Sequence, residues 1–505
     1  MEFQTLLLVI TFMCATILIF ILRKLNQAQN SRKLPPGPHP LPIIGNILEL
    51  GKNPHKSLTK LSKIYGPIMT LKLGTITTIV ISSPQVAKQV LQENSQVFSN
   101  RTIPHASYVL DHHKFSLVWL PTLDLWKKLR KICATKVFSN KMLDSTKILR
   151  QQKLQELLNH VNEQSKKGEA FDIGEAVFTT VLNSISNTLF SMDLAHSIHG
   201  QESQEFMKII WGIMEEAGKP NVSDFFPILR PLDLQSVYAK GTNYLKRLYE
   251  IFYEIIEERI SSRSTKGYSE DVCNDVLDSL LKGNNIGETT LELSHNEMVH
   301  LFMDLFVAGI DTTSCTIEWI MAELLRNPEK LTKAKKELCQ EIGKDETIEE
   351  SHICKLPFLQ AVVKESLRLH PPGPLLLPHI CDKSVNILGF NVPKNAQVLV
   401  NLWAMGRDST IWENPNMFLP ERFLESEINY KGNNFELIPF GAGKRICPGL
   451  PLAHRSVHLI VASLLCNFEW TLANGLKPED MNMEEKFGLT LKMVQSLRVQ
   501  ATSSA

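Results

Sequence analysis

The spacing of apolar and polar residues along the chain predicts three kinds of element. From Thr5 to Leu22 no charge interrupts a run rich in Leu, Ile, Val and Phe, which is typical of a short transmembrane helix. The β-branched and apolar runs Met69–Leu73 and Thr77–Ile81 surround Gly74 and predict a hairpin. Beyond Pro84 apolar residues recur with helical spacing for most of the next three hundred residues. The sequence therefore predicts a mainly α fold with small β-sheets.

Basic residues follow the apolar N-terminal run and none precedes it. They are Arg23, Lys24, Arg32 and Lys33, and positive charges on this side hold the downstream chain in the cytosol. A cleaved signal peptide is the alternative, but it would carry its positive charges before the apolar run and a small-residue cleavage site after it. We therefore expect residues 1–24 to form a single-pass membrane anchor.

A proline-rich stretch, Leu34–Pro42, comes next and is suited to an extended conformation rather than a helix or a central strand. A ligand for a proline-binding partner is the alternative, but the stretch leads directly into the apolar start of a fold. Beyond it the sequence has no linker, repeat or low-complexity tract. We divide the chain into an anchor (1–24), a linker and hinge (25–45) and one large domain (46–505).

Composition and charge narrow the class of protein. The 505 residues are 43% apolar and 21% charged, which is ordinary for a globular protein. The net charge of +1 argues against a nucleic-acid-binding protein, which would carry a basic excess. The nine cysteines are odd in number and lack a C-x-x-C pair, so we expect reduced thiols in a cytosol-facing protein.

The strongest chemical signal is the loop Pro439–Gly449, which precedes an apolar run, Leu450–Cys466, predicted to be helical. We interpret Cys447 as a metal-bound thiolate, because a helix N-terminus and Arg445 would supply positive potential beside it. Pro448 fits the first position of the helix, where its missing N–H has no consequence.

Two glycines of this loop suit a flat cofactor. Gly441 and Gly443 can adopt positive φ and have no side chain, so a planar ring could lie against their backbone. A buried, inert cysteine in a glycine turn is the alternative. Against it, the pattern Phe-Gly-x-Gly-x-Arg-x-Cys-x-Gly, which begins at Phe440, fixes six positions at set spacing.

That pattern resembles the haem-binding signature of the cytochrome P-450 haem-thiolate monooxygenases. The resemblance implies haem b between a long central helix and the cysteine loop, with Cys447 as the axial ligand of the iron, whose electron-rich sulfur favours O–O cleavage. It also implies that Arg445, Phe440, Gly441 and Gly443 border the cofactor. In this family an anchor followed by a proline-rich hinge marks microsomal members, so the implied location is the endoplasmic reticulum membrane.

A Trp-x-x-x-Arg motif places Trp126 and Arg130 on one helical face, where an indole N–H and a guanidinium can reach one anionic group. The resemblance assigns that anion as a haem propionate; taken alone, the motif indicates a surface cation beside a core tryptophan. Lys127, Lys128 and Lys131 form a basic patch nearby. Either they help to dock an acidic NADPH-cytochrome reductase or they form a solvated charged face.

The segment His300–Leu325 predicts one long, mostly buried helix with a polar interruption at its middle. Gly309 removes a side chain where O₂ or substrate would be crowded, and a carboxylate with hydroxyls inside an apolar helix requires a reason. The resemblance assigns Thr312 as the catalytic hydroxyl and Asp311 as the partner that brings protons. A haem-thiolate isomerase or dehydratase would keep Cys447 but would not need this pair.

Two further stretches of the sequence differ from the helical pattern around them. Asn100–Pro121 lacks a regular pattern, and the resemblance places it over the haem; we expect His112 and His113 there to lie in a solvated loop. Val385–Leu388 and Ala396–Asn401 flank a turn and predict a second small hairpin.

Three charged residues predict a structural network. Glu365 and Arg368 lie at i and i+3 of a helix, and Arg422 completes a network that, in the family pattern, holds the loop beneath the haem. His379 occupies a position where many relatives carry an arginine, which leaves its contact to a propionate open.

Other segments resemble the plant subgroup that contains geraniol 8-hydroxylase and ferruginol synthase: Phe171–Ala176, Asn183–Ser191 and Pro371–Pro378. That subgroup chiefly hydroxylates terpenoids. The resemblance implies an NADPH- and O₂-dependent monooxygenase that hydroxylates a small lipophilic plant metabolite, a mono- or diterpenoid first of all. The same chemistry on an alkaloid, a phenolic or a xenobiotic stays open, as does a catalytically silent haem-binding scaffold.

Overall fold

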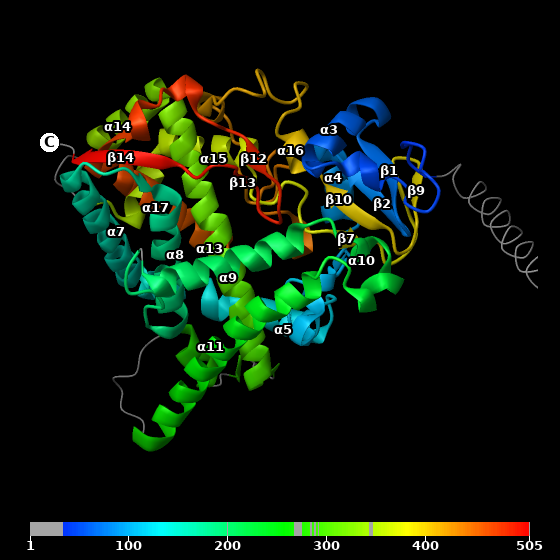
Figure 1. Cartoon of the computed structure of the whole chain (residues 1–505), viewed down its shortest axis with the longest axis horizontal. Helices are drawn as coiled ribbons and strands as arrows, with labels where there is room; N and C mark the ends of the chain where they lie inside the picture. The colour runs from blue at the N-terminus through cyan, green and yellow to red at the C-terminus, as the bar shows by residue number, and fades with distance from the viewer. Residues whose placement is uncertain are drawn as a thin grey trace, which may run out of the picture.

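A computed structural model describes residues 34–198, 200–266, 275–282, 285–286, 289–290, 292–342 and 347–503. Helices form the larger part of the molecule, and the strands β1, β2 and β10 gather at one side of it (Figure 1). The expected anchor, residues 1–24, lies outside the described residues. Within the described ranges, no helix is both long and apolar enough to span a bilayer.

The mainly α prediction is confirmed by sixteen α-helices in the described residues. They are α2 (Ile47–Leu50), α3 (Pro54–Tyr65), α4 (Pro84–Lys88), α5 (Asp124–Ile132), α6 (Asn140–Ser145), α7 (Lys147–Lys167), α8 (Ile173–Phe190), α9 (Gln201–Gly218), α10 (Val222–Phe225), α11 (Val237–Lys266), α12 (Val276–Leu281), α13 (His295–Arg326), α14 (Pro328–Glu341), α15 (Pro357–Leu369), α16 (Leu402–Met405) and α17 (Leu450–Asn467).

The strands form one five-stranded sheet, in the order β1-β2-β10-β7-β3, and several smaller ones. Their bounds are β1 (Ile68–Leu73), β2 (Ile76–Ile81), β3 (Asn100–Arg101), β4 (Phe171–Asp172), β5 (Asn285–Ile286), β6 (Thr289–Thr290), β7 (His379–Ile380), β8 (Val385–Ile387), β9 (Phe390–Val392), β10 (Gln397–Val400), β11 (Phe468–Leu472), β12 (Glu485–Lys486), β13 (Lys492–Met493) and β14 (Arg498–Ser503).

The first predicted hairpin is confirmed, whereas the second is wrong. β1 and β2 pair in antiparallel fashion. β8, however, pairs with β9 rather than with β10, because Leu388 and Gly389 both have positive φ and turn the chain back at once. β10 joins the large sheet instead, parallel to β2 and antiparallel to β7, where Val398 and Val400 are fully buried.

The predicted central helix is confirmed as α13, which passes through the middle of the helical body (Figure 1). It begins five residues earlier than the apolar run suggested, because Ser294 and Glu297 form a capping box that satisfies the first free N–H groups. It packs against α8, α11, α15 and α17. One face of α13 can therefore border a site whose other residues come from distant parts of the chain.

The helix after the cysteine loop is confirmed as α17, but Pro448 does not begin it. The first helical hydrogen bond runs from the N–H of Ala453 to the carbonyl of Gly449 at 2.9 Å. Pro451 therefore stands in the first turn, where its missing N–H removes no hydrogen bond. Pro448 lies ahead of the helix, within the turn that carries Cys447.

The predicted charge network is confirmed. Both guanidinium nitrogens that Arg368 presents to Glu365 donate at 2.7 Å, and Nε of Arg422 donates to the same carboxylate at 3.1 Å. The side chains of Glu365 and Arg368 are completely buried. Arg368 also donates to the carbonyls of Gly406 and Pro415, so the network fastens α15 to the long segment that leads toward the cysteine loop.

Candidate active site

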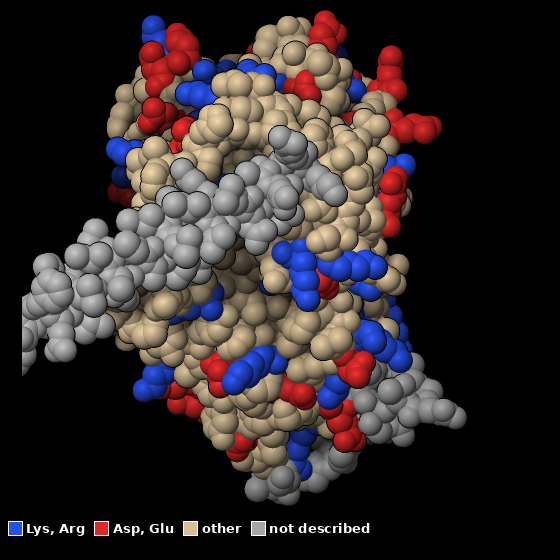
Figure 2. All heavy atoms as spheres, turned by 90° about the vertical axis from the view of Figure 1, so that its right-hand side faces the viewer, with Lys and Arg blue, Asp and Glu red and all other residues tan. Residues whose placement is uncertain are grey.

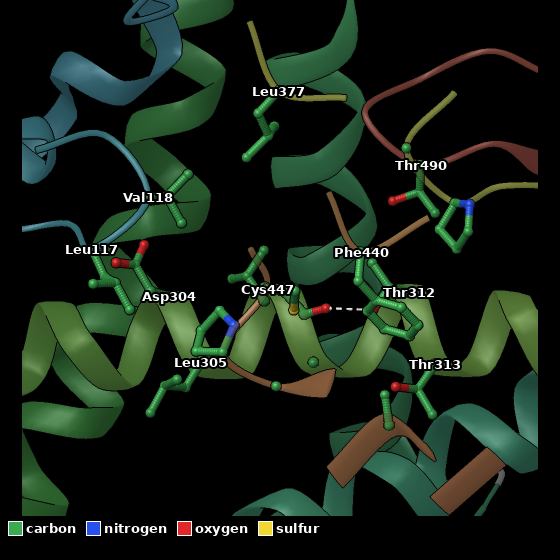
Figure 3. A pocket seen from close by; sticks show the side chains of 18 of the residues that line it. Leu117, Val118, Asp304, Leu305, Thr312, Thr313, Leu377, Phe440, Cys447 and Thr490 are labelled. Atoms are coloured by element: carbon green, nitrogen blue, oxygen red, sulfur yellow. Dashed lines mark hydrogen bonds between the residues drawn. The ribbon is translucent and has the colours of Figure 1, made fainter. Parts of the chain in front are cut away.

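An apolar cavity of about 420 Å³ lies between α13 and the cysteine loop. Thr312 and Thr313 face it from α13, while Phe440 and Cys447 come from the loop on another side (Figure 3). Leu376 and Leu377 also line it, whereas Leu375 packs in a separate apolar cluster with residues of β1 and β2. The structure thus brings the two strongest motifs of the sequence to one cavity.

Cys447 is placed as a metal ligand would be. Burial raises the pKa of its thiol, while the backbone N–H groups of Gly449 and Leu450 and the charge of Arg130 act in the opposite direction. Its own N–H donates to the carbonyl of Phe440 at 2.9 Å, which closes the loop. A thiol in the cavity wall with two inward N–H groups suits a thiolate that is held by a cation in the cavity.

The two loop glycines have different surroundings. At Gly441 (φ +72°) the nearest protein atom to an added Cβ is 4.0 Å away, and the residue lines the cavity, so its backbone is open to a flat ring. At Gly443 (φ +64°) an added Cβ would lie 1.9 Å from the carbonyl oxygen of Leu91. Gly443 therefore allows the loop to approach the backbone of Leu91, and Gly441 is the glycine that faces the cavity.

Cations without carboxylate partners surround the same cavity. Arg101, Arg130 and Arg445 line it, and none forms an ion pair within the ranges that the structure describes. Burial lowers the pKa of Arg101 to about 9 and that of Arg445 to about 10, and in each case a second guanidinium adds to the effect. Half-buried positive charges without a carboxylate partner call for an anion. The two propionates of a haem would supply it, so the residues fit this cofactor.

Arg445 is held by the segment that crosses over the cavity. Its guanidinium donates to the carbonyls of Ser99 at 2.6 Å, of Leu117 at 3.2 Å and of Leu120, and it lies 4.8 Å from the centre of the Trp126 ring. The indole N–H of Trp126 donates to Leu117 at 3.2 Å. Trp126 and Arg130 both line the cavity from α5, but here the indole N–H bonds to backbone rather than to a shared anion.

Arg101 is a candidate that the sequence analysis missed. It is half-buried in the cavity wall, donates to the carbonyl of Leu377, and leaves its buried Nε without a hydrogen-bond partner among the described residues. It pairs with His379 across β3 and β7, a register that joins positions far apart in the sequence and leaves no local pattern. His379 itself is buried beside Arg101, its Nδ1 lies 2.6 Å from the carbonyl of Phe98, and burial lowers its pKa far enough to keep it neutral.

The two residues predicted at the notch of α13 point in different directions. Thr312 faces the cavity, and its hydroxyl donates to the carbonyl of Ala308 at 2.7 Å (Figure 3). Asp311 is buried away from the cavity lining, 2.5 Å from Nζ of Lys492 on β13. Lys492 was also missed, since only the fold brings the C-terminal segment to this helix. An added Cβ at Gly309 would lie 2.7 Å from Ile185, so the glycine admits a neighbouring helix.

The solvated-loop interpretation of His112 is wrong. His112 is buried and bonded to His300 and Asp304 on α13, because these polar groups satisfy one another between two apolar layers. His113 is half-buried, with its ring 4.3 Å from that of Tyr108. The expectation that this segment overlies the cavity agrees with the lining, which includes His112.

The basic patch on α5 is partly neutralised. Lys127 pairs with Asp124 at 3.2 Å, and both side chains are largely exposed. Lys128 lies 3.4 Å from Glu297 at the start of α13. The exposed pair of Lys127 and Asp124 contributes little to stability.

The cavity, the thiol in its wall and the cations without carboxylate partners suit a haem-thiolate site. The family model for cytochrome P450 matches residues 35–497, and the chain belongs to that family. Members bind haem with a cysteine thiolate as axial ligand, and the protein is a haem-thiolate monooxygenase. The family also implies a redox partner, a substrate and O₂.

Several relatives match almost the whole chain. Cytochrome P450 76T24 of Catharanthus roseus is 51% identical over 97% of this chain and 97% of its own length. Geraniol 8-hydroxylase of the same plant is 49% identical over 93% of this chain and 94% of its own. Geranylhydroquinone 3''-hydroxylase of Arnebia euchroma is 46% identical, again over 93% and 94%. The similarity to the plant subgroup with geraniol 8-hydroxylase is therefore confirmed.

Proposed function

We propose that the protein uses NADPH and O₂ to hydroxylate a small terpenoid. The observation that carries the proposal is an apolar cavity of about 420 Å³ that ends at Cys447, in a chain similar to enzymes named for hydroxylating geraniol and geranylhydroquinone. A cavity of this size suits a small lipophilic molecule. The electrons would come from NADPH through a cytochrome reductase, and Lys127, Lys128 and Lys131 on α5 offer it a basic docking surface.

We assign the cofactor contacts as follows. Cys447 is the metal ligand, Gly441 and Phe440 lie against the ring, and Gly443 shapes the loop. Haem bound in this way supplies oxygen activation at its iron. The propionates would be bound by Arg130 and Trp126, with Arg445 and Arg101 completing the positive surroundings; this role requires the Trp126 N–H to leave Leu117.

The proton-handling roles fall to two neighbouring residues of α13. Thr312 presents its hydroxyl to the cavity and donates to Ala308, so it can pass a proton inward only by turning from that carbonyl. Asp311 is the partner that brings protons, and Lys492, with a quarter of its side chain exposed, links it to solvent. Excess water is kept out by the apolar lining of the cavity.

We also propose attachment to the endoplasmic reticulum membrane through residues 1–24, with 25–45 as linker and hinge and 46–505 as the cytosolic domain. Support comes from exposed apolar side chains at the start of the described chain, where Ile43 is 81% exposed, and on the turn after α10, where Ile228 is 86% exposed. The turn between β1 and β2 links these regions, because the N–H of Gly74 donates to Ile44 and the N–H of Thr75 donates to Phe225. Figure 2 shows this side of the molecule with a broad uncharged area between charged groups.

The test is a product assay with the full chain, a plant reductase and NADPH. Geraniol, an abietane diterpene, a flavonoid and a phenylurea would be supplied in turn and the products identified by mass spectrometry. We expect hydroxylated geraniol or diterpene. Turnover of the aromatic compounds alone would keep the chemistry and overturn the terpenoid substrate.

A further inference from the structure

A buried polar cluster borders the cavity at a distance from the thiolate. His112 lies at its centre: its Nε2 is 3.1 Å from Oδ1 of Asp304, and its Nδ1 is 2.8 Å from Nδ1 of His300. The hydroxyl of Ser116 donates to the same Oδ1 at 2.8 Å. All four side chains are at least nine-tenths buried, and His112 and Asp304 line the cavity.

The hydrogen bonds of the cluster show how its ring nitrogens are used. A carboxylate only accepts, so Nε2 of His112 carries the hydrogen that it donates to Asp304. Burial lowers the pKa of His300 to about 4, so this ring is neutral at physiological pH. The contact between Nδ1 of His112 and Nδ1 of His300 needs one ring to donate and the other to accept, so both nitrogens of His112 are used.

Asp304 is left with one oxygen that has no partner. Both donors reach Oδ1, whereas Oδ2 has no hydrogen bond in the part of the chain that the structure describes. Leu117, Val118 and Leu305 lie beside Asp304 on the cavity wall and leave Oδ2 almost no accessible surface, so a ligand would reach this oxygen by displacing one of these apolar side chains (Figure 3). A buried acceptor without a donor is costly, and a donor brought by a ligand would remove that cost.

The position of Asp304 suits one end of an elongated ligand. Eight residues of α13 separate it from Thr312, which corresponds to a rise of about 12 Å along the helix axis. A molecule lying along α13 could place a polar group at Asp304 while its other end lies beside Thr312 and Cys447. The cavity between these points is apolar, so it offers the hydrocarbon part no competing partner.

We propose that Asp304, oriented by His112 and Ser116, accepts a hydrogen bond from a hydroxyl group of the substrate and thereby holds the opposite, hydrocarbon end at the haem. The inference rests on the proposed function and narrows it to an elongated terpenoid alcohol. It assigns Asp304 to substrate binding and His112 to positioning, and it explains why a charged group lies in an apolar wall.

The test compares three ligands that differ in one group: geraniol, its methyl ether and the hydrocarbon 2,6-dimethylocta-2,6-diene. Binding to the holoenzyme would be followed by the shift of the Soret band, which needs neither reductase nor NADPH. Because Oδ2 can only accept, we expect the alcohol to bind about tenfold more tightly than both other ligands. Equal binding of the three by the unaltered protein would overturn the inference.

Asp304→Asn keeps nearly the same shape but replaces the accepting oxygen Oδ2 by an amide nitrogen, which donates a hydrogen bond. We expect this variant to lose most of the preference for the alcohol and to gain affinity for the methyl ether, a change of sign that a purely structural role would not produce. Asp111→Asn is the matched control, because Asp111 lies one residue before His112 but is exposed, and its pattern should equal that of the unaltered protein. An unchanged order of affinities in Asp304→Asn would also refute the role.

The two proposals fail in different ways. If geraniol binds with the expected preference but gives no product with reductase, the proposed substrate is wrong and the role of Asp304 stands. If geraniol is hydroxylated but the protein does not distinguish the alcohol from its ether, the proposed function stands and the role of Asp304 is wrong. Geranylamine binding more tightly than geraniol would replace the hydroxyl by an ammonium and overturn the inference as stated.

Discussion

Loss of the charge on Glu365 is expected to destabilise the protein more than any surface substitution. The carboxylate is completely buried and accepts from Arg368, from Arg422 and from the N–H of Leu419 at 2.8 Å. Glu365→Gln keeps the shape but leaves the buried guanidinium of Arg368 without its anion. Breaking a buried pair on one side costs about 3–5 kcal/mol, a large part of the 5–15 kcal/mol that is typical for total stability.

The measurement is urea unfolding of the holoprotein, followed by far-UV circular dichroism and by the Soret band of the reduced, carbon-monoxide-treated form. Glu421→Gln is the control, because Glu421 is partly exposed and pairs with Lys330 and Lys333 at the surface. A pair of that kind contributes about 0–1 kcal/mol. If Glu365→Gln lost no more stability than Glu421→Gln, the network would not hold the segment below the cavity as we argue.

Three further predictions concern the site, and a fourth concerns stability. Cys447→Ala should abolish the red-shifted Soret band of the reduced, carbon-monoxide-treated protein; a retained band would mean another ligand. Thr312→Ala should keep NADPH consumption but divert it from product to hydrogen peroxide, which a peroxide assay would measure; unchanged coupling would remove its catalytic role. Lys492→Met leaves the carboxylate of Asp311 buried without a cation, so we expect slower, less coupled turnover with a larger solvent isotope effect, and an unaltered isotope effect would disconnect this pair from proton supply. Burial raises the pKa of Glu318 from 4.5 to about 7, so its native form holds a proton that the unfolded chain has released; stability should fall as pH rises from about 4.5 to 7, and Glu318→Gln should reduce this slope in melts at several pH values.

Elements with local signals could be predicted from the sequence. α13 and α17 appear as long apolar runs, and the capping box of Ser294 and Glu297 that adds the first turns of α13 is also readable in the sequence. Glu365 and Arg368 lie on adjacent turns of one helix. In each case the partners are close in the chain, so spacing alone carries the geometry.

The contacts that complete the site depend on distant pairing. Arg101 reaches the cavity only through its register with His379, and Lys492 reaches α13 only because β13 folds back over it. The second predicted hairpin was wrong for a related reason: two positive-φ residues, Leu388 and Gly389, reverse the chain earlier than the apolar pattern suggests. His112 looked like a loop residue because its partners, His300 and Asp304, lie almost two hundred residues away.

Asp311 and Thr312 are neighbours in the sequence, but the helix directs their side chains to different surroundings. Successive residues of an α-helix point about 100° apart, so Asp311 and Thr312 direct their side chains differently, and only Thr312 lines the cavity. Thr312 faces the cavity, whereas Asp311 pairs with Lys492 on the other side of the helix. The proposed transfer of a proton from Asp311 to the cavity therefore requires a side chain to rotate or a water molecule to bridge the two sides of the helix. Because Lys492 and the cavity-lining Thr490 lie two residues apart, the same C-terminal segment touches both the substrate space and the acid.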